Sequence, residues 1–471
     1  MATRETVVII SDLHLGAGDD FDIFAGSGKT ESFVSFIETV GKWPGVVEVI
    51  INGDFVDFLQ LEPWDLRVDR REAEQKMRRI VSAYKDTIFR ALGQFLDSPE
   101  HRVTVLLGNH DVELAFPEVW KRAADAILAA AKPDAAARLS SLAHDKTRVT
   151  YVRSVGGVLV HIEHGNADDP YNGMNYTTLF HDVERNTSDF SYPPGTQLVY
   201  DIMNRHKREF RFVDLLKPEI PAVPFLLAAM KPKALIDVPG IAAKSLAAVG
   251  NKFIGWLRTK ISGPTLARTG AASSTETVDE QLARDMAAAY QDAVGGSSAV
   301  SDADAFLLQQ YFESDGDDVS PEHAVMAPSL KTAKRRLARA AIGSLGRPID
   351  LRDEMYYKTD HANRADAMWA RQRLTGDVRV VVFGHTHRPL KTEFEGNGLY
   401  VNSGAWANQM TLPGPSEDIG DWMSSVRSNS ERNRAGFPTY VTLTAETGGA
   451  DVSLNLWEGA GRLLWRKSIR A

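Results

Sequence analysis

The chain has 471 residues, of which 43% are hydrophobic and none is cysteine. Disulfides, thiolate nucleophiles and cysteine-ligated zinc are therefore excluded, and any metal must be held by nitrogen and oxygen ligands. The net charge of −8 argues against a protein that coats nucleic acid non-specifically, because that mode needs clustered Lys and Arg, but it is compatible with a specific nuclease.

The first apolar run, at residues 7–10, is too short for a signal peptide or a membrane span, so we expect a cytoplasmic protein. Residues 7–10, 46–51 and 103–107 are rich in β-branched and aliphatic side chains and end in polar clusters, which predicts three buried strands. Helical patterns between them, over about residues 30–43 and 71–95, indicate alternating strands and helices.

Further along the chain, residues 149–152 and 158–162 flank a Gly-Gly turn and predict a hairpin. Helical periodicity then predominates until strand patterns resume at residues 378–383. Three apolar runs near the C-terminus predict the strands of a closing sheet, at residues 439–445, 451–457 and 461–465.

Side chains that can bind metal follow five of these predicted strands. Strand ends are where α/β folds place ligands, because the sheet holds the loop rigid while its backbone stays free. The clusters are Asp12-Leu13-His14, Gly53-Asp54-Phe55-Val56-Asp57, Gly108-Asn109-His110-Asp111, His164-Gly165-Asn166 and Gly384-His385-Thr386-His387. One cluster alone would be weak evidence, since Asp12 or Asp54 could equally cap a helix or form a turn. Five together favour a metal site.

Phosphoester hydrolysis explains why such residues would be brought together. It needs a nucleophilic hydroxide at neutral pH and neutralisation of charge on the phosphoryl oxygens, and two divalent ions about 3.5–4 Å apart supply both. A carboxylate can bridge the ions, while neutral imidazole and amide ligands leave enough positive charge to lower the pKa of bound water.

The ordered motifs D-x-H, G-D-x-x-D, G-N-H-D/E, a later His-Gly segment and G-H-x-H resemble those of the calcineurin-like metallophosphoesterase superfamily. The resemblance covers residues 7–166 and 378–404. It implies an α/β (α+β) fold, namely a two-sheet β-sandwich flanked by helices. This agrees with the strand and helix patterns above.

The resemblance also implies that Asp12 and His387 share one ion, so the two ends of the chain must fold together. We therefore predict that residues 1–166 and 377–471 form one catalytic domain. Residues 167–376 would then be a large, mainly helical insertion or cap.

By the same resemblance, seven residues would hold two divalent metal ions, for which we favour Mn, with Fe, Zn or Co also compatible. The first ion would be bound by Asp12, His14 and His387, the second by Asn109, His164 and His385, and Asp54 would bridge them.

His110 is expected to face the leaving group and to protonate or hydrogen-bond it. Asp111 would orient the imidazole and favour its charged form, and Asp57 would hold a ligand or the backbone of the metal loop. Other interpretations remain open for some of these residues. His110 could be a purely structural histidine, His161 and His181 are expected to be structural or substrate-facing, and Asn402 could make a turn or strand-end hydrogen bond.

The predicted function is a binuclear metal-dependent phosphoester hydrolase, in which a metal-activated hydroxide attacks phosphorus in a phosphodiester or pyrophosphate. Within the superfamily the chain looks most like bacterial UDP-2,3-diacylglucosamine pyrophosphatases, which carry Arg in place of His110 and a shorter insertion. The shared residues are Ser11-Asp12-Leu13-His14-Leu15-Gly16, Asp168, Asp169, Tyr171 and Gly384 through Arg388-Pro389. Alternatives are a nucleotide phosphodiesterase, a nuclease or a phosphomonoesterase, and a non-catalytic scaffold of the same fold, which should show broken ligand motifs.

One block of the predicted insertion carries a distinct charge. Residues 205–270 contain twelve Lys and Arg against four Asp and Glu, interleaved with apolar residues. Such a block could contact an anionic membrane peripherally or admit a lipid-like phosphoester. The alternative is an ordinary helical subdomain whose apolar residues pack inward.

Overall fold

The computed structural model divides into two compact units, Met1–Thr196, Ile349–Gln409 and Arg434–Ala471 in the first, and Gln197–Pro348 and Met410–Asn433 in the second. The residues that the structure describes are 4–26, 28–64, 69–141, 149–169, 172–185, 192–193, 195–196, 199–207, 215, 365–410, 434–435 and 437–471. Most of the predicted insertion at residues 167–376 lies outside the described residues, so its helical character stays a prediction.

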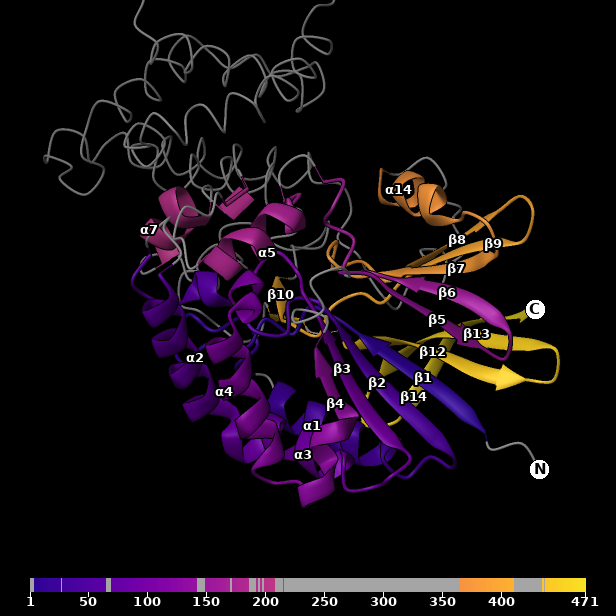
Figure 1. Cartoon of the computed structure of the whole chain (residues 1–471), viewed down its shortest axis with the longest axis horizontal. Helices are drawn as coiled ribbons and strands as arrows, with labels where there is room; N and C mark the ends of the chain where they lie inside the picture. The colour runs from indigo at the N-terminus through magenta and orange to yellow at the C-terminus, as the bar shows by residue number, and fades with distance from the viewer. Residues whose placement is uncertain are drawn as a thin grey trace, which may run out of the picture. The chain divides into compact units, whose positions relative to one another are not determined.

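Seven strands form the larger sheet, in the order β14-β13-β12-β1-β2-β3-β4. Their bounds are β1 Glu5–Ile10, β2 Val46–Asn52, β3 His101–Leu106, β4 Leu139–Ser141, β12 Thr439–Glu446, β13 Gly449–Trp457 and β14 Gly461–Arg470. Strands β1 to β4 are parallel, and β12 joins β1 in antiparallel register. The N-terminal and C-terminal strands therefore share one sheet, as Figure 1 shows.

Five strands form the second sheet, in the order β5-β6-β7-β9-β8. Their bounds are β5 Tyr151–Val155, β6 Val158–Ile162, β7 Val378–Phe383, β8 Leu390–Phe394 and β9 Gly398–Asn402. Strand β7 pairs in parallel with both β6 and β9, so strands from distant parts of the chain lie side by side. Two short strands, β10 Gln409–Met410 and β11 Arg434–Ala435, form a separate pair.

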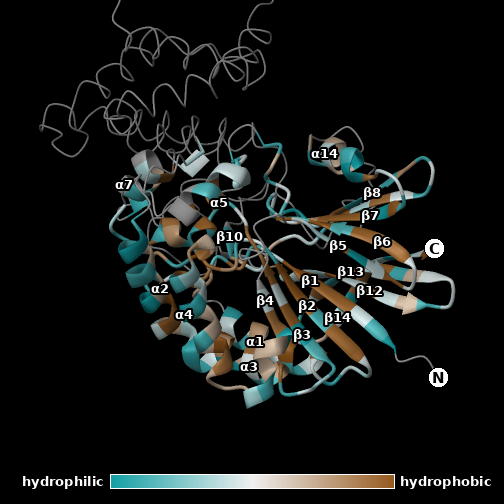
Figure 2. Ribbon diagram, in the orientation of Figure 1, coloured by the Kyte–Doolittle hydropathy of each residue, from teal (hydrophilic) through white to brown (hydrophobic). Residues whose placement is uncertain are grey.

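The two large sheets pack against each other around an apolar core. Val7 and Ile9 of β1 belong to the same buried cluster as Val160 of β6 and Val380 of β7. Figure 2 shows this hydrophobic character along the strands of both sheets. Alternate residues such as Val8 are also fully buried, as expected for parallel strands with both faces covered.

Helices α1 to α4 lie over the outer face of the seven-stranded sheet, and α14 lies over the five-stranded sheet (Figure 1). The helices are α1 Lys29–Val40, α2 Arg70–Tyr84, α3 Arg90–Phe95, α4 Pro117–Leu128, α5 Tyr176–Arg185, α7 Asn204–Lys207 and α14 Ala365–Arg373. The helix predicted over residues 71–95 is interrupted by a π-helical turn at Lys85–Phe89. Shorter helical turns are Phe58–Gln60, Val112–Ala115, Pro133–Arg138 and Val199–Met203.

The observed architecture is thus the mixed α/β sandwich flanked by helices that the sequence predicted. Within the described part of the chain, every helix is too short or too polar to cross a lipid bilayer.

Candidate metal centre

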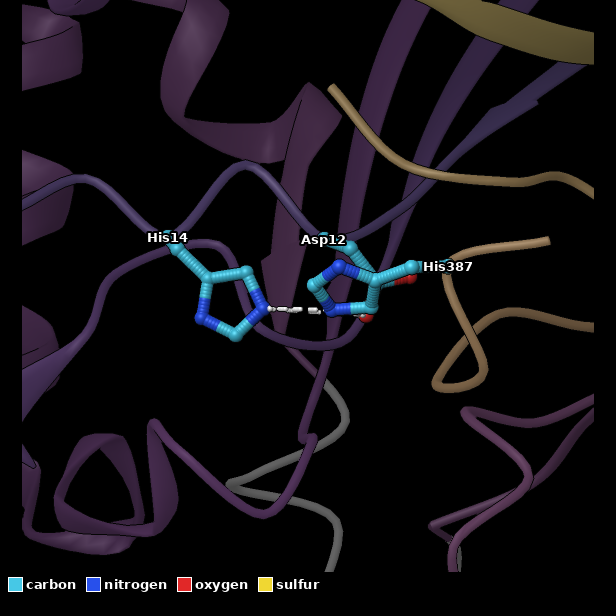
Figure 3. A group of neighbouring side chains, drawn as sticks. All are labelled: Asp12, His14 and His387. Carbon is cyan, nitrogen blue, oxygen red and sulfur yellow. Dashed lines mark hydrogen bonds and ion pairs between the residues drawn. The ribbon is translucent and has the colours of Figure 1, made fainter. Parts of the chain in front are cut away.

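Polar clusters from both ends of the sequence meet where strands of the two sheets end. His387, which follows β7, places its Nε2 atom 3.2 Å from Asp12 Oδ1 and 3.0 Å from His14 Nε2. Figure 3 shows these three side chains pointing toward one another, with Asp12 and His14 supplied by the loop after β1. All three side chains are buried. The predicted convergence of the termini is therefore present in the fold.

Asp54, in the loop after β2, connects this group to His164, in the loop after β6. The Asp54 Oδ2 atom lies 3.5 Å from His14 Nε2 and 3.1 Å from His164 Nε2. Asp12, His14 and His387 form one group with ligand atoms within 4.8 Å of one another, and Asp12, Asp54 and His164 form a second. Two overlapping groups with Asp54 in contact with both are suited to a pair of neighbouring cations.

The remaining predicted ligands, Asn109 and His385, border the same region. Asn109 is buried and directly precedes His110, whose backbone N–H donates a hydrogen bond to Asp54 Oδ1 at 2.9 Å. The His385 ring lies 5.3 Å from the His164 ring between centroids. The structure thus brings all seven predicted residues to one place, and their assignment as ligands stays a prediction.

Backbone conformation marks the same residues. Among the described residues, six that are not glycine have a positive φ angle. Five of the six are predicted ligands, namely Asp12, His14, Asp54, His385 and His387, with φ between 51° and 65°. Such a backbone costs about 1–3 kcal/mol per residue and persists where the surrounding structure enforces it, typically at functional sites.

Glycines in the motifs let the loops approach one another closely. A Cβ atom at Gly108 would overlap the side chain and backbone nitrogen of Asp54, and a Cβ atom at Gly53 would overlap the imidazole of His164. Gly53 also has a φ of 82°, which other residues rarely adopt. These two positions therefore need glycine for packing at the site as well as for the turn.

The chemistry of the cluster fits divalent metal ions. Three buried atoms, Asp12 Oδ1, Asn109 Oδ1 and His164 Nε2, make no hydrogen bond within the described part of the chain, although Asp12 Oδ1 and His164 Nε2 each face an ion-pair partner. Buried polar atoms are normally satisfied, so each such atom needs an explanation. Carboxylate oxygen, amide oxygen and imidazole nitrogen together suit Mn, Fe, Zn or Co, and coordination would satisfy all three atoms.

The electrostatics lead to the same conclusion. Burial disfavours the charged imidazoles, but Asp54 and neighbouring carboxylates outweigh it and raise the pKa of His14 to about 10 and the pKa of His164 to about 9. Burial likewise disfavours the carboxylates, yet the facing histidines hold the pKa of Asp12 and Asp54 well below the usual range. A metal ion and a proton compete for the same imidazole nitrogens. In the metal-free protein, protons on His14 and His164 therefore occupy positions at which cations would bind.

Asp57 joins His14 to His110. Its Oδ2 atom is 2.9 Å from His14 Nδ1 and 3.0 Å from His110 Nδ1. The contact with His14 agrees with the expectation that Asp57 holds a ligand. Burial opposes protonation of His110, but Asp57 and Asp54 raise the pKa of its imidazole. The His110 side chain is 17% exposed whereas that of Asp57 is 3% exposed, so the histidine is the more accessible of the two.

The expectation that Asp111 orients His110 is wrong. The Asp111 carboxylate instead accepts hydrogen bonds from the backbone N–H groups of Phe55 at 2.8 Å and Gly108 at 2.7 Å. It therefore ties the loop after β2 to the loop after β3, and Asp57 orients the imidazole. Sequence adjacency misled the prediction, because successive side chains of a loop need not face the same side.

Other polar residues support the loops from outside. Asn402 donates hydrogen bonds to the carbonyl oxygen of Gly384 at 2.7 Å and to Thr386 Oγ1 at 3.2 Å, which is the strand-end bonding expected for it. Sequence reasoning gave no role to Asp169, whose Oδ2 atom lies 2.8 Å from His385 Nε2. The pair Asp168-Asp169 after the His-Gly segment was the only hint of this contact, and Tyr171 lies outside the described residues.

The helix-flanked sandwich thus gathers buried Asp and His residues at its strand ends, in groups that could hold metal ions. The family model described as calcineurin-like phosphoesterase, Metallophos, matches residues 5–218. This stretch, 214 of the 471 residues, matches that superfamily, which supports a metal-dependent phosphoester hydrolase.

Comparisons with solved structures and with curated proteins do not narrow the function further. A solved structure of a conserved uncharacterized protein, described as a predicted phosphoesterase, from Streptococcus pneumoniae TIGR4 is 10% identical, with 100% of this chain and 99% of that chain covered and a TM-score of 0.23. A TM-score this low does not indicate a shared fold. The comparison with curated proteins finds no match.

Proposed function

We propose that the chain is a binuclear metal-dependent hydrolase of a phosphodiester or pyrophosphate. The observation that carries the proposal is the position of Asp54, whose Oδ2 atom lies 3.5 Å from His14 Nε2 and 3.1 Å from His164 Nε2. One carboxylate thus contacts a histidine from each predicted ligand set. The first ion would be held by Asp12, His14 and His387, the second by Asn109, His164 and His385, with Asp54 between them.

When bound, the two cations would supply an activated water nucleophile and neutralise charge on the phosphoryl oxygens. We propose Mn as the metal, with Fe, Zn and Co as alternatives that the same ligand types accept. Metal analysis of the purified protein distinguishes these ions.

His110 is proposed to protonate or hydrogen-bond the oxygen of the leaving group. Its Nδ1 atom is held by Asp57 at 3.0 Å, which leaves the opposite ring nitrogen to face a substrate. Burial lowers the pKa of His110 and the adjacent Asp57 carboxylate raises it, so Asp57 favours the protonated ring that can supply a proton to a departing alkoxide.

The bridging role is tested by Asp54→Ala. Loss of a carboxylate that contacts both ligand groups should abolish turnover and lower the metal content of the purified protein. The measurements are metal analysis and a panel of Mn-supplemented phosphomonoesters, phosphodiesters, nucleotides and nucleotide-linked lipid pyrophosphates. Asp134→Ala is the matched control, because that carboxylate is 66% exposed and pairs only with Arg138 among its described ion pairs. Full activity in the Asp54 variant would refute the bridging role.

The same panel identifies the substrate class. Preference for nucleotides or single-stranded nucleic acid would support the nuclease alternative, whereas preference for lipid-linked pyrophosphates would support the likeness noted in the sequence. A lipid-like substrate would also accord with peripheral membrane contact through residues 205–270, of which only 205–207 and 215 are described. Liposome co-sedimentation with and without this block tests that contact, and equal binding by both proteins would remove it.

A further inference from the structure

We propose that Asp169 is a positioning residue that fixes the ring of His385 and thereby sets the affinity of the second metal position. The inference rests on the proposed function and deepens it. It concerns a residue outside the seven assigned ligands and outside the pair formed by His110 and Asp57.

The contact between the two side chains is close and largely sheltered. Asp169 Oδ2 lies 2.8 Å from His385 Nε2, and the two side chains are 16% and 9% exposed. The backbone of His385 is held separately, because its N–H donates a hydrogen bond to Asp12 Oδ2 at 3.0 Å. His385 is therefore anchored at its backbone by one predicted ligand and at its ring by Asp169.

A carboxylate on one ring nitrogen determines which nitrogen is left to bind a metal. When Asp169 accepts the N–H at Nε2, the lone pair of the neutral ring of His385 is at Nδ1. Such partners also fix the ring orientation and raise ligand basicity. The geometry thus assigns Nδ1 as the atom that His385 would offer to a cation.

Asp169 is itself held in a well-bonded turn. Its backbone N–H donates to the carbonyl oxygen of Asn166 at 3.0 Å, and its Oδ2 atom accepts from Asn172 Nδ2 at 3.1 Å. A carboxylate with this support can transmit a defined orientation to its partner, whereas one on an unsupported loop could not.

An arginine forms ion pairs with the segment that carries Asp169. Arg373, at the end of α14, places Nη2 2.7 Å from Asp168 Oδ2 and 3.1 Å from Glu163 Oε1. Glu163 directly precedes the predicted ligand His164, and Asp168 directly precedes Asp169. The guanidinium of Arg373 therefore connects the segment that carries His164 to the segment that carries Asp169. This connection fixes the spacing between the two segments on either side of the second metal position.

The test is a Mn²⁺ titration of the metal-free, full-length protein, with free Mn²⁺ followed by electron paramagnetic resonance. Asp169→Ala should weaken the second binding step by roughly 10–100-fold, the usual effect of removing a group that orients a metal ligand, while the first step stays within about twofold. Asp169→Asn keeps an acceptor for the ring N–H, so its loss of Mn²⁺ affinity should be smaller. This variant also replaces Asp169→Ala in the test if the alanine variant does not fold. Asp134→Ala should bind both ions as the unmodified protein does.

A double variant separates action through His385 from a general structural effect. If Asp169 acts by orienting that ring, Asp169→Ala combined with His385→Ala should bind Mn²⁺ no more weakly than His385→Ala alone. Unchanged affinity for both ions in Asp169→Ala and Asp169→Asn would overturn the inference and leave the proposed function standing. Binding of a single ion by the unmodified protein would overturn both.

Discussion

Asp57 is the residue through which the predicted metal ligands and the leaving-group histidine are connected. One oxygen atom contacts His14 at 2.9 Å and His110 at 3.0 Å. Burial disfavours its charge, but the two imidazoles hold the pKa of Asp57 well below the usual range. A permanently ionised carboxylate can orient both rings at once, so a change at this position would disturb ligand and acid together.

His110 gives a sharper single-residue prediction. His110→Ala should lower kcat by about 10²–10⁴, the usual contribution of a general acid, while the metal content stays unchanged. The loss should be small for a substrate with a nitrophenolate leaving group, because that group departs without protonation. Turnover of activated and unactivated esters, with metal analysis of the same samples, provides the measurement. Equal losses on both substrates would contradict the assignment.

The metal-free protein should lose stability as pH rises. The folded-state pKa values of His14, about 10, and His164, about 9, lie above the ordinary value of 6.5, so between these limits the native state holds more protons than the unfolded state. The resulting stabilisation is complete below about pH 6.5 and is lost as pH rises through about 9 to 10.

Urea unfolding of the metal-free protein at pH 7 and pH 10 measures this effect. The midpoint should fall at the higher pH, and the fall should be smaller when Mn²⁺ is bound, because coordination needs neutral imidazoles. His164→Asn is the comparison variant, in which part of the fall should disappear. A midpoint that does not change in the unmodified protein would contradict the electrostatic picture.

Among the elements, the loops after β1, β2, β3, β6 and β7 carry the site, and the strands set their spacing. The apolar runs predicted the strands well, because burial on both faces leaves a continuous β-branched pattern. Strand β4, Leu139–Ser141, escaped prediction because three residues are too few to show a period. The π-helical turn at Lys85–Phe89 likewise escaped prediction, because five residues are too few to show a change of period.

Close approach of two loops gives a prediction at this scale. Gly108→Ala should destabilise the fold by about 1–3 kcal/mol and weaken metal binding, because the new methyl group would displace Asp54. Gly448→Ala is the control, since its φ is 76° but nothing lies within 4 Å of a Cβ there. That change should cost about 1–2 kcal/mol through the backbone alone and leave metal binding intact. Chemical denaturation and metal titration of both variants make the comparison.

For the whole molecule, the packing of the two sheets around a shared core brings the loop after β1, with Asp12, next to the loop after β7, with His387. The ordered motifs predicted this convergence. They could not predict the partners of individual side chains, such as Asp57 rather than Asp111 for His110, or Asp169 for His385. Those partners depend on how the loops are arranged in space. No short-range pattern in the sequence predicts that arrangement.

The central claim is that residues from both ends of the chain enclose two cations with Asp54 between them. The most direct measurement is a crystal structure of the Mn²⁺-loaded protein with anomalous difference maps. We expect two peaks, one in contact with Asp12, His14 and His387 and the other with Asn109, His164 and His385, and both in contact with Asp54. A single peak, or two peaks that Asp54 does not join, would contradict the account.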